Sequence, residues 1–170
     1  MDQRKTKDLQ EVDIEILFWG PVGEKDTGHA ALHVVKPELY ISFWPSVDSP
    51  GLDRVPSKAM SYADDLHETG MGREPSSVYK ARIGLDMKAV SEFWELQQKK
   101  DYFVVGNNCS TAVIEALRAG NDAFKVSPYG PDLNIKDDFF VGPYTREVVE
   151  IYEKLESFLQ EAALNGSNKN

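Results

Sequence analysis

The chain has a single cysteine, and this cysteine stands where one kind of local pattern gives way to another. Residues 101–105 are aromatic and β-branched, which is typical of a short strand or an extended segment, and residues 106–108 are typical of a turn. Beyond the turn, small and apolar residues recur at helical spacing until Gly120. The pattern therefore predicts an extended segment, a turn and a helix, with Cys109 at or beside the helix N-terminus.

A cysteine at the start of a helix has a particular electrostatic environment. The unpaired N–H groups of the first turn and the positive end of the helix dipole favour a thiolate, which is the reactive form of the side chain. A lone cysteine is also common as an inert, buried residue. The segment around Cys109 alone therefore leaves a nucleophile and a structural cysteine both open.

The rest of the chain alternates between strand patterns, helix patterns and polar connections. Apolar or alternating runs predict strands, and apolar stripes at helical spacing predict helices: strands over residues 13–19, 28–35, 39–45 and 77–83, and helices capped by Asp86 and by Thr145. The second and third strands are separated by a short connector that contains a proline, which predicts an antiparallel hairpin. We expect an α+β fold in which a small antiparallel sheet packs against helices.

A chain of 170 residues is long enough for one domain with a substantial core, and no feature of the sequence requires a second. We expect this single domain to span residues 13–164. The polar ends, residues 1–12 and 165–170, are expected to be disordered.

The net charge of −9 and the isoelectric point near 4.8 argue against nucleic acid or an anionic membrane as the main partner, because both would be repelled. The N-terminus is not followed by an apolar signal segment, and no stretch has the length and hydrophobicity of a membrane span. One cysteine cannot form an internal disulfide, which favours a reducing compartment. We therefore expect a cytoplasmic protein, or one delivered by a secretion system that does not need a signal peptide.

About thirty residues, 45–76, show no strong periodicity. Such long connections in small domains are often lids or binding segments. Within them, residues 57–68 could form one short helix, whose charged and imidazole side chains make a metal site conceivable: Asp64, Asp65, His67 and Glu68. A solvated charged surface is the interpretation that we favour.

His29 stands at the mouth of the first hairpin strand, next to two alanines that would let another element approach closely. His33 follows four positions later, but on a strand two side chains at that spacing lie roughly 13 Å apart, which is too far to share one ion. We expect neither a metal site here nor a cofactor. A structural, hydrogen-bonded histidine at a strand end is the alternative to a functional role for His29.

A histidine can activate a cysteine when it takes the thiol proton and returns it to a leaving group, and a third polar side chain commonly fixes the imidazole. The two residues need to be close in space only, so the eighty positions between His29 and Cys109 are no objection. If the helix that begins at Cys109 packs against the strand that begins at His29, the two side chains meet. The backbone N–H of Cys109 would then be a natural donor to an oxyanion.

This order of motifs resembles the circularly permuted papain-like fold, the group that includes permuted NlpC-type amidases, lecithin:retinol acyltransferase-like proteins and PPPDE-type deubiquitinating peptidases. The matching segments are residues 28–32, 40–45 and 107–113. In ordinary papain-like enzymes the cysteine precedes the histidine, and permutation reverses that order. The resemblance implies that Cys109 is the nucleophile and that His29 is the base.

In this group a third polar residue usually lies on the second hairpin strand, about a dozen positions after the histidine. Here Ile41 occupies the twelfth position and Ser42 the thirteenth. We choose Ser42, because alternation along a strand places it on one face with Tyr40 and Trp44. Ser46 is the reserve, since a hairpin pairs the start of one strand with the end of the other.

These residues predict a cysteine hydrolase of the amidase or peptidase type that acts through a thioester acyl-enzyme on a peptide, an isopeptide or another acyl substrate. Tyr40, Trp44 and Asn108 are expected to contact the substrate, although Asn108 could instead only shape the turn before the cysteine. Two alternative functions stay open: an acyltransferase of the same fold, and a catalytically inactive module that binds a partner through residues 45–76.

Overall fold

A computed structural model of the chain describes residues 7–20, 22, 28–48, 50–104 and 106–124. The helix expected from Thr145 and the expected disordered tail, residues 165–170, lie outside the described residues.

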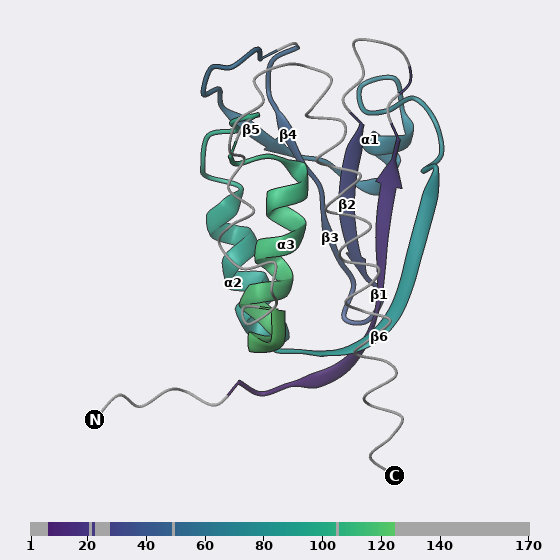
Figure 1. The fold of residues 1–170 in the computed structure, drawn as a ribbon, viewed down its shortest axis with the longest axis vertical. Helices are drawn as coiled ribbons and strands as arrows, with labels where there is room; N and C mark the ends of the chain where they lie inside the picture. Colours follow the sequence, from purple (N-terminus) through teal and green to yellow (C-terminus); the bar gives the residue numbers. More distant parts are fainter. Residues whose placement is uncertain (1–6, 21, 23–27, 49, 105, 125–170) are drawn as a thin grey trace, which may run out of the picture.

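Four strands form one antiparallel sheet in the order β3-β2-β1-β6 (Figure 1). The long strand β1 (Gln10–Trp19) pairs with β2 (His29–Val34) on one side and with β6 (Ser77–Leu85) on the other, and β3 (Leu39–Ile41) pairs with β2. The predicted hairpin and the predicted strand that begins at residue 77 are both confirmed.

β1 begins at Gln10, three residues before the expected start at Asp13. Residues 10–12, which we expected in a disordered N-terminus, pair with the last residues of β6, so that Val12 lies opposite Ile83. The polar side chains of the first two residues of the strand suggested a disordered segment, and this expectation was wrong. Strand pairing depends on backbone hydrogen bonds, which polar residues form as well as apolar ones.

The run that predicts one strand over residues 39–45 forms two strands. The first, β3, ends at Ile41, and Ser42 belongs to neither strand. The second, β4 (Phe43–Pro45), leaves the main sheet and pairs with β5 (Ser57–Ala59). The connection that follows contains the short helix α1 (Tyr62–Leu66). The segment without periodicity in the sequence is therefore organised around short elements.

Two helices lie side by side on one face of the sheet (Figure 1). α2 (Met87–Gln97) is capped by the side chain of Asp86, and α3 (Cys109–Gly120) is capped by the side chain of Asn108. A short 3-10 helix, η1 (Asp122–Phe124), follows α3. The helix starts predicted after Asp86 and at Cys109 are both confirmed. A side-chain acceptor in the capping position stabilises a helix by roughly 1 kcal/mol.

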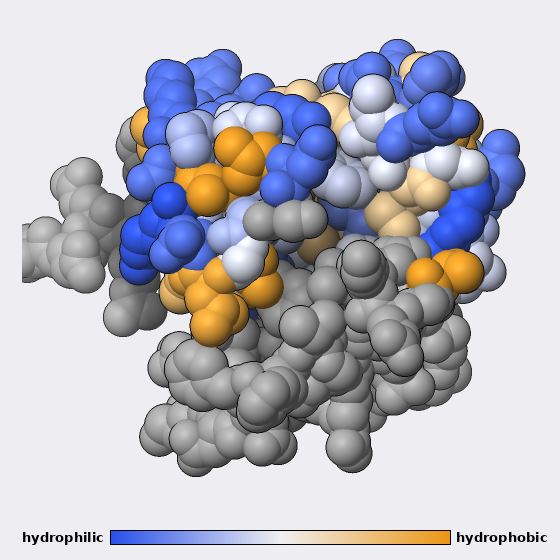
Figure 2. Space-filling view, turned by 90° about the horizontal axis from the view of Figure 1, so that it is seen from above, coloured by the Kyte–Doolittle hydropathy of each residue, from blue (hydrophilic) through white to orange (hydrophobic). Residues whose placement is uncertain are grey.

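The end of the molecule at which α3 begins has a mainly hydrophilic surface (Figure 2). Hydrophobic residues are visible there as small groups between hydrophilic ones. In the loop between β4 and β5, for example, Val47 is 43 % exposed and Leu52 is 60 % exposed. Among the described residues that this view shows, hydrophobic groups therefore do not merge into one large apolar patch.

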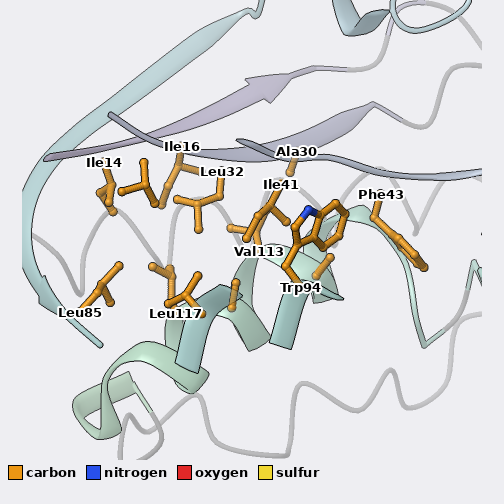
Figure 3. Packing of buried hydrophobic residues seen from close by; sticks show 14 of the residues in the cluster. Ile14, Ile16, Ala30, Leu32, Ile41, Phe43, Leu85, Trp94, Val113 and Leu117 are labelled. Carbon is orange, nitrogen blue, oxygen red and sulfur yellow. The ribbon is translucent and has the colours of Figure 1, made fainter. Parts of the chain in front are cut away.

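The main core lies between the sheet and the two helices (Figure 3). Alternate residues of β1 and β2, among them Ile14, Ile16 and Leu32, point to this side and meet Val113 and Leu117 of α3. These five side chains are at most 2 % exposed, and the burial of each contributes about 1.5–3 kcal/mol. The packing holds α3 against β2, and this contact decides where the first residue of each element lies.

The observed fold is α+β, with a small antiparallel sheet and a few helices, as expected. No helix within the described residues is both long enough and apolar enough to cross a membrane.

Candidate active site

Cys109 is the first residue of α3 and is only 3 % exposed. The side chain of Asn108 fixes the turn before it. The amide oxygen accepts hydrogen bonds from the N–H and the hydroxyl of Thr111, at 3.0 and 3.1 Å, and the amide nitrogen donates to the carbonyl of Val104 at 2.9 Å. The predicted position of the cysteine at a helix N-terminus is confirmed. Both the oxygen and the nitrogen of the Asn108 side-chain amide form hydrogen bonds within the chain.

His29 is the first residue of β2 and lies opposite Trp19 of β1. Its side chain is 2 % exposed and interacts with the side chain of Cys109, so that each of the two groups shifts the pKa of the other. The two residues that the sequence pattern pairs across eighty positions therefore lie side by side. Their contact joins the sheet to the N-terminus of α3.

The other side of the imidazole faces a buried carboxylate. Nε2 of His29 lies 2.9 Å from Oγ of Ser42 and 3.5 Å from Oδ2 of Asp65. The hydroxyl of Ser42 donates to Oδ1 of Asp65 at 3.0 Å, so its oxygen is left to accept from the Nε2–H of His29. With a proton on Nε2, the ring presents Nδ1 to the thiol, which is the arrangement that a base needs.

Asp65 is fully buried and accepts several hydrogen bonds. The hydroxyl of Tyr40 donates to Oδ2 at 2.7 Å, and the indole N–H of Trp44 donates to Oδ1 at 2.8 Å. The prediction that Tyr40, Ser42 and Trp44 share one face is confirmed, because all three reach the same carboxylate. A buried charge is stable only when it is paired and hydrogen-bonded, and these donors meet that condition.

The pKa values of Cys109, His29 and Asp65 shift in this cluster. Burial raises the pKa of the Cys109 thiol, but the charge and the hydrogen bond of the His29 imidazolium outweigh burial and hold this pKa below its usual range. Burial opposes the charged form of His29, whereas the Cys109 thiolate and Asp65 favour it and raise the pKa of His29 to about 9. Burial likewise opposes the charge of Asp65, and the hydrogen bond from His29 leads the effects that lower its pKa. The thiolate and the imidazolium therefore stabilise each other.

Two indole rings enclose the imidazole. The ring centroid of Trp44 lies 4.4 Å from that of His29, and the centroid of Trp19 lies 5.4 Å from it. Trp19 is fully buried, and Trp44 is half-buried. Indole rings at this distance attract a cation, so the enclosure favours the charged imidazolium and restricts its rotation.

Asp65 is held in place by the turn that follows α1. Ser61 and Asp64 form a capping box at the start of the helix, and the N–H of Met71 donates to the carbonyl of Asp65 at 2.8 Å. Gly70 packs so close to α1 that a β-carbon there would lie 2.5 Å from the carbonyl oxygen of Asp64 and 2.6 Å from the α-carbon of Asp65. Only glycine fits this position without displacing the backbone.

The sequence pattern did not identify Asp65 as part of the site. Its neighbours Asp64, His67 and Glu68 are exposed, as expected for a solvated charged surface, but Asp65 is buried, which corrects that expectation. One signal was available, because three side chains with hydrogen-bond donors alternate along residues 40–44 and need a buried acceptor. A carboxylate in the next ordered helix supplies it.

The remaining candidates lie apart from the cysteine and histidine. Ser46, the reserve third residue, is exposed, and its hydroxyl donates to the carbonyl of Pro56 at 2.8 Å. Nδ1 of His33 lies 3.0 Å from Oε2 of Glu15. Within the part of the chain that the structure describes, no group of three or more histidine, cysteine or acidic side chains could hold a metal ion.

No protein-family model matches the chain, and no curated protein and no solved structure matches it either. Any function must therefore be argued from the geometry and chemistry of the site itself.

Proposed function

We propose that the chain is a cysteine hydrolase that cleaves an amide bond through a thioester acyl-enzyme. The observation that carries the proposal is the buried series Cys109, His29 and Asp65, in which the thiol and the imidazole shift each other's pKa and Nε2 of the imidazole lies 3.5 Å from the carboxylate. Folding does not require three ionisable side chains to be buried together, because desolvation penalises each of them. Perturbed pKa values in such a cluster are typical of catalytic groups.

In the first half of the reaction, the Cys109 thiolate attacks the carbonyl carbon of the amide. The N–H of Cys109 donates to the oxyanion that forms, because the N–H groups of a first helical turn have no acceptor within the helix. The His29 imidazolium gives its Nδ1 proton to the leaving amine, and the C–N bond breaks. The acyl group stays on sulfur as a thioester, and His29 is left neutral.

In the second half, neutral His29 takes a proton from water, and the water oxygen bonds to the carbonyl carbon of the thioester. The C–S bond then breaks with its electron pair on sulfur, which releases the carboxylic acid and restores the thiolate and the imidazolium. Ser42 and Asp65 keep the imidazole in the required orientation through Nε2 in both halves.

The proposal includes a circularly permuted papain-like fold. A histidine at the first residue of β2 and, later in the chain, a cysteine at the first residue of α3 support it. The described residues at the end of the molecule where α3 begins present a mainly hydrophilic surface, which supports a peptide, isopeptide or protein substrate over a lipid acyl chain.

Labelling of the thiol with iodoacetamide across a range of pH tests the proposal. The wild-type protein should react with a midpoint well below the ordinary thiol pKa of about 8.5, and His29→Ala should raise that midpoint. Electrophilic peptide and ubiquitin-type probes then test the substrate class, with Cys109→Ala as the control that lacks the nucleophile. An ordinary midpoint that does not depend on His29 would sink the proposal and favour a non-catalytic binding module.

A further inference from the structure

Ser110 follows the cysteine in the first turn of α3 and is 1 % exposed. Its hydroxyl has no hydrogen-bond partner, and among the described residues it is the one buried side-chain nitrogen or oxygen atom that lacks a partner. Buried hydroxyl groups nearly always have a partner, because desolvation without one costs free energy. If this residue served only to fill the core, alanine would fill the same place at a lower cost.

Ser110 directly follows Cys109, so its hydroxyl and the sulfur belong to the same first turn of α3. Burial raises the pKa of the Cys109 thiol, and against it act first the imidazolium of His29 and then the backbone N–H of Ala30 and the hydroxyl of Ser110. A hydroxyl hydrogen rotates about its C–O bond, so it can turn toward the sulfur when the sulfur is charged. A neutral thioester sulfur is a much weaker acceptor than a thiolate.

We propose that Ser110 is a positioning residue whose hydroxyl donates to the Cys109 sulfur whenever that sulfur carries negative charge, and that it thereby promotes hydrolysis of the acyl-enzyme. This inference rests on the proposed function. When water adds to the thioester and gives its proton to His29, the C–S bond breaks and its electron pair moves to sulfur. The Ser110 hydroxyl stabilises the charge that develops there, so the sulfur leaves more readily.

The other charged groups near the sulfur act from the opposite side. Among the described residues, the titratable side chains that face the Cys109 and His29 pair are Asp65 and, bonded to Asp65, Tyr40. Both act through the imidazole, whereas Ser110 lies on the same helix as the sulfur. Removal of its hydroxyl changes no formal charge, so its effect can be measured separately from that of the ion pair.

Ser110→Ala tests the inference, and Ser110→Thr, which keeps the hydroxyl, is the matched variant. In Ser110→Ala the midpoint of iodoacetamide labelling should rise by about one pH unit. The acetyl-enzyme formed from p-nitrophenyl acetate should hydrolyse roughly threefold more slowly, because the sulfur carries only part of its final charge in the transition state. The unfolding temperature should stay equal or rise, since no regular hydrogen bond is lost. Ser110→Thr should keep the wild-type midpoint, and so should Ser46→Ala, which removes an exposed hydroxyl.

An unchanged midpoint and an unchanged rate in Ser110→Ala, with a wild-type midpoint that still depends on His29, would overturn this inference and leave the proposed function standing. Equal shifts in Ser110→Ala and Ser110→Thr would also overturn it, because packing and not the hydroxyl would then be responsible. An ordinary thiol midpoint in the wild-type protein would overturn both proposals together.

Discussion

β2 carries two histidines, four positions apart and on the same face of the sheet, and each of them contacts a carboxylate. His33 lies 3.0 Å from Glu15, with the two side chains 27 % and 24 % exposed. His29 lies 3.5 Å from Asp65, with the two side chains 2 % and 0 % exposed. The shorter of the two contacts is therefore the partly exposed pair of His33 and Glu15, and not the buried pair of His29 and Asp65 in the candidate site.

The partners of the two carboxylates explain the difference. Glu15 also binds Lys80 at 2.7 Å, and the hydrogen bond from Lys80 comes before that from His33 among the effects that lower the pKa of Glu15. The other donors to Asp65 among the described residues are uncharged hydroxyl and indole groups. Water screens the first pair and is excluded from the second. His29, which we assign to catalysis, is distinguished by its burial and by a carboxylate whose other donors among the described residues are uncharged. The shorter histidine–carboxylate distance belongs to His33.

Replacement of each histidine by alanine should separate the two pairs most strongly. His29→Ala should lower kcat/KM for amide hydrolysis by roughly 10³-fold, since the general acid and base is lost. His33→Ala should stay within about twofold, because a partly exposed contact that water screens contributes little. Steady-state kinetics on a peptide substrate checks this, with circular dichroism to show that both variants are folded. Equal losses in the two variants would contradict the assignment.

The carboxylates can be compared by Asp65→Asn and Glu15→Gln, which remove one charge each at nearly constant size. We expect Asp65→Asn to lower kcat by roughly 10²-fold, because an amide no longer stabilises the imidazolium. The pKa of His29, followed by NMR of its ring protons, should fall in this variant and stay unchanged in Glu15→Gln. Wild-type kcat in Asp65→Asn would mean that Asp65 is structural and that Ser42 alone orients the ring.

The rate of amide hydrolysis should depend on pH through the protonation of His29. The pKa of His29 is raised from 6.5 to about 9, so the imidazolium persists at neutral pH and is lost as the pH rises through about 9. Amide hydrolysis should then fall about tenfold per pH unit above this value, because no acid protonates the leaving amine. Iodoacetamide labelling should not fall there, since the thiolate remains. A rate that already declines near pH 6.5 would show that the buried imidazole is not held in its charged form.

The smallest effect is expected for Trp44→Phe, which keeps an aromatic ring beside His29 but removes the N–H that donates to Asp65. A loss of about threefold to tenfold in kcat should follow, with little change in KM. Tyr62→Phe is the matched control, because it removes a hydroxyl that donates to exposed Glu74. A greater loss in Tyr62→Phe than in Trp44→Phe would argue against the enclosure of the imidazole as a functional feature.

The strands, the helix starts and the candidate pair could be predicted because each leaves a mark in neighbouring residues. Alternation along residues 77–83 indicates a strand with one buried face, Asp86 indicates a helix cap, and the turn over residues 106–108 followed by helical spacing indicates a helix start at Cys109. The packing of α3 on β2 follows from their apolar faces. Once the two elements pack, the cysteine and the histidine at their first residues are brought together.

Asp65 and the interruption at Ser42 could not be predicted, because both depend on contacts between distant segments. α1 is only five residues long, which is too short to show a hydrophobic period. A carboxylate that a distant strand buries looks, in the sequence, like its exposed neighbour Asp64. In the same way, the strand at residue 42 ends because β4 pairs with β5, and no local residue marks that choice.

Under the proposed function, the packing of Gly70 on α1 should help to set the fraction of molecules in which Asp65 is in place beside the imidazole. A helix of five residues is not stable alone, so α1 is held only by its contacts with the rest of the chain. Local opening of these contacts would take Asp65 away from the imidazole without requiring the sheet and α3 to unfold. The competent fraction therefore follows the local opening equilibrium of α1 rather than the global stability of the protein. A β-carbon at position 70 would lower this fraction without changing any group that meets the substrate.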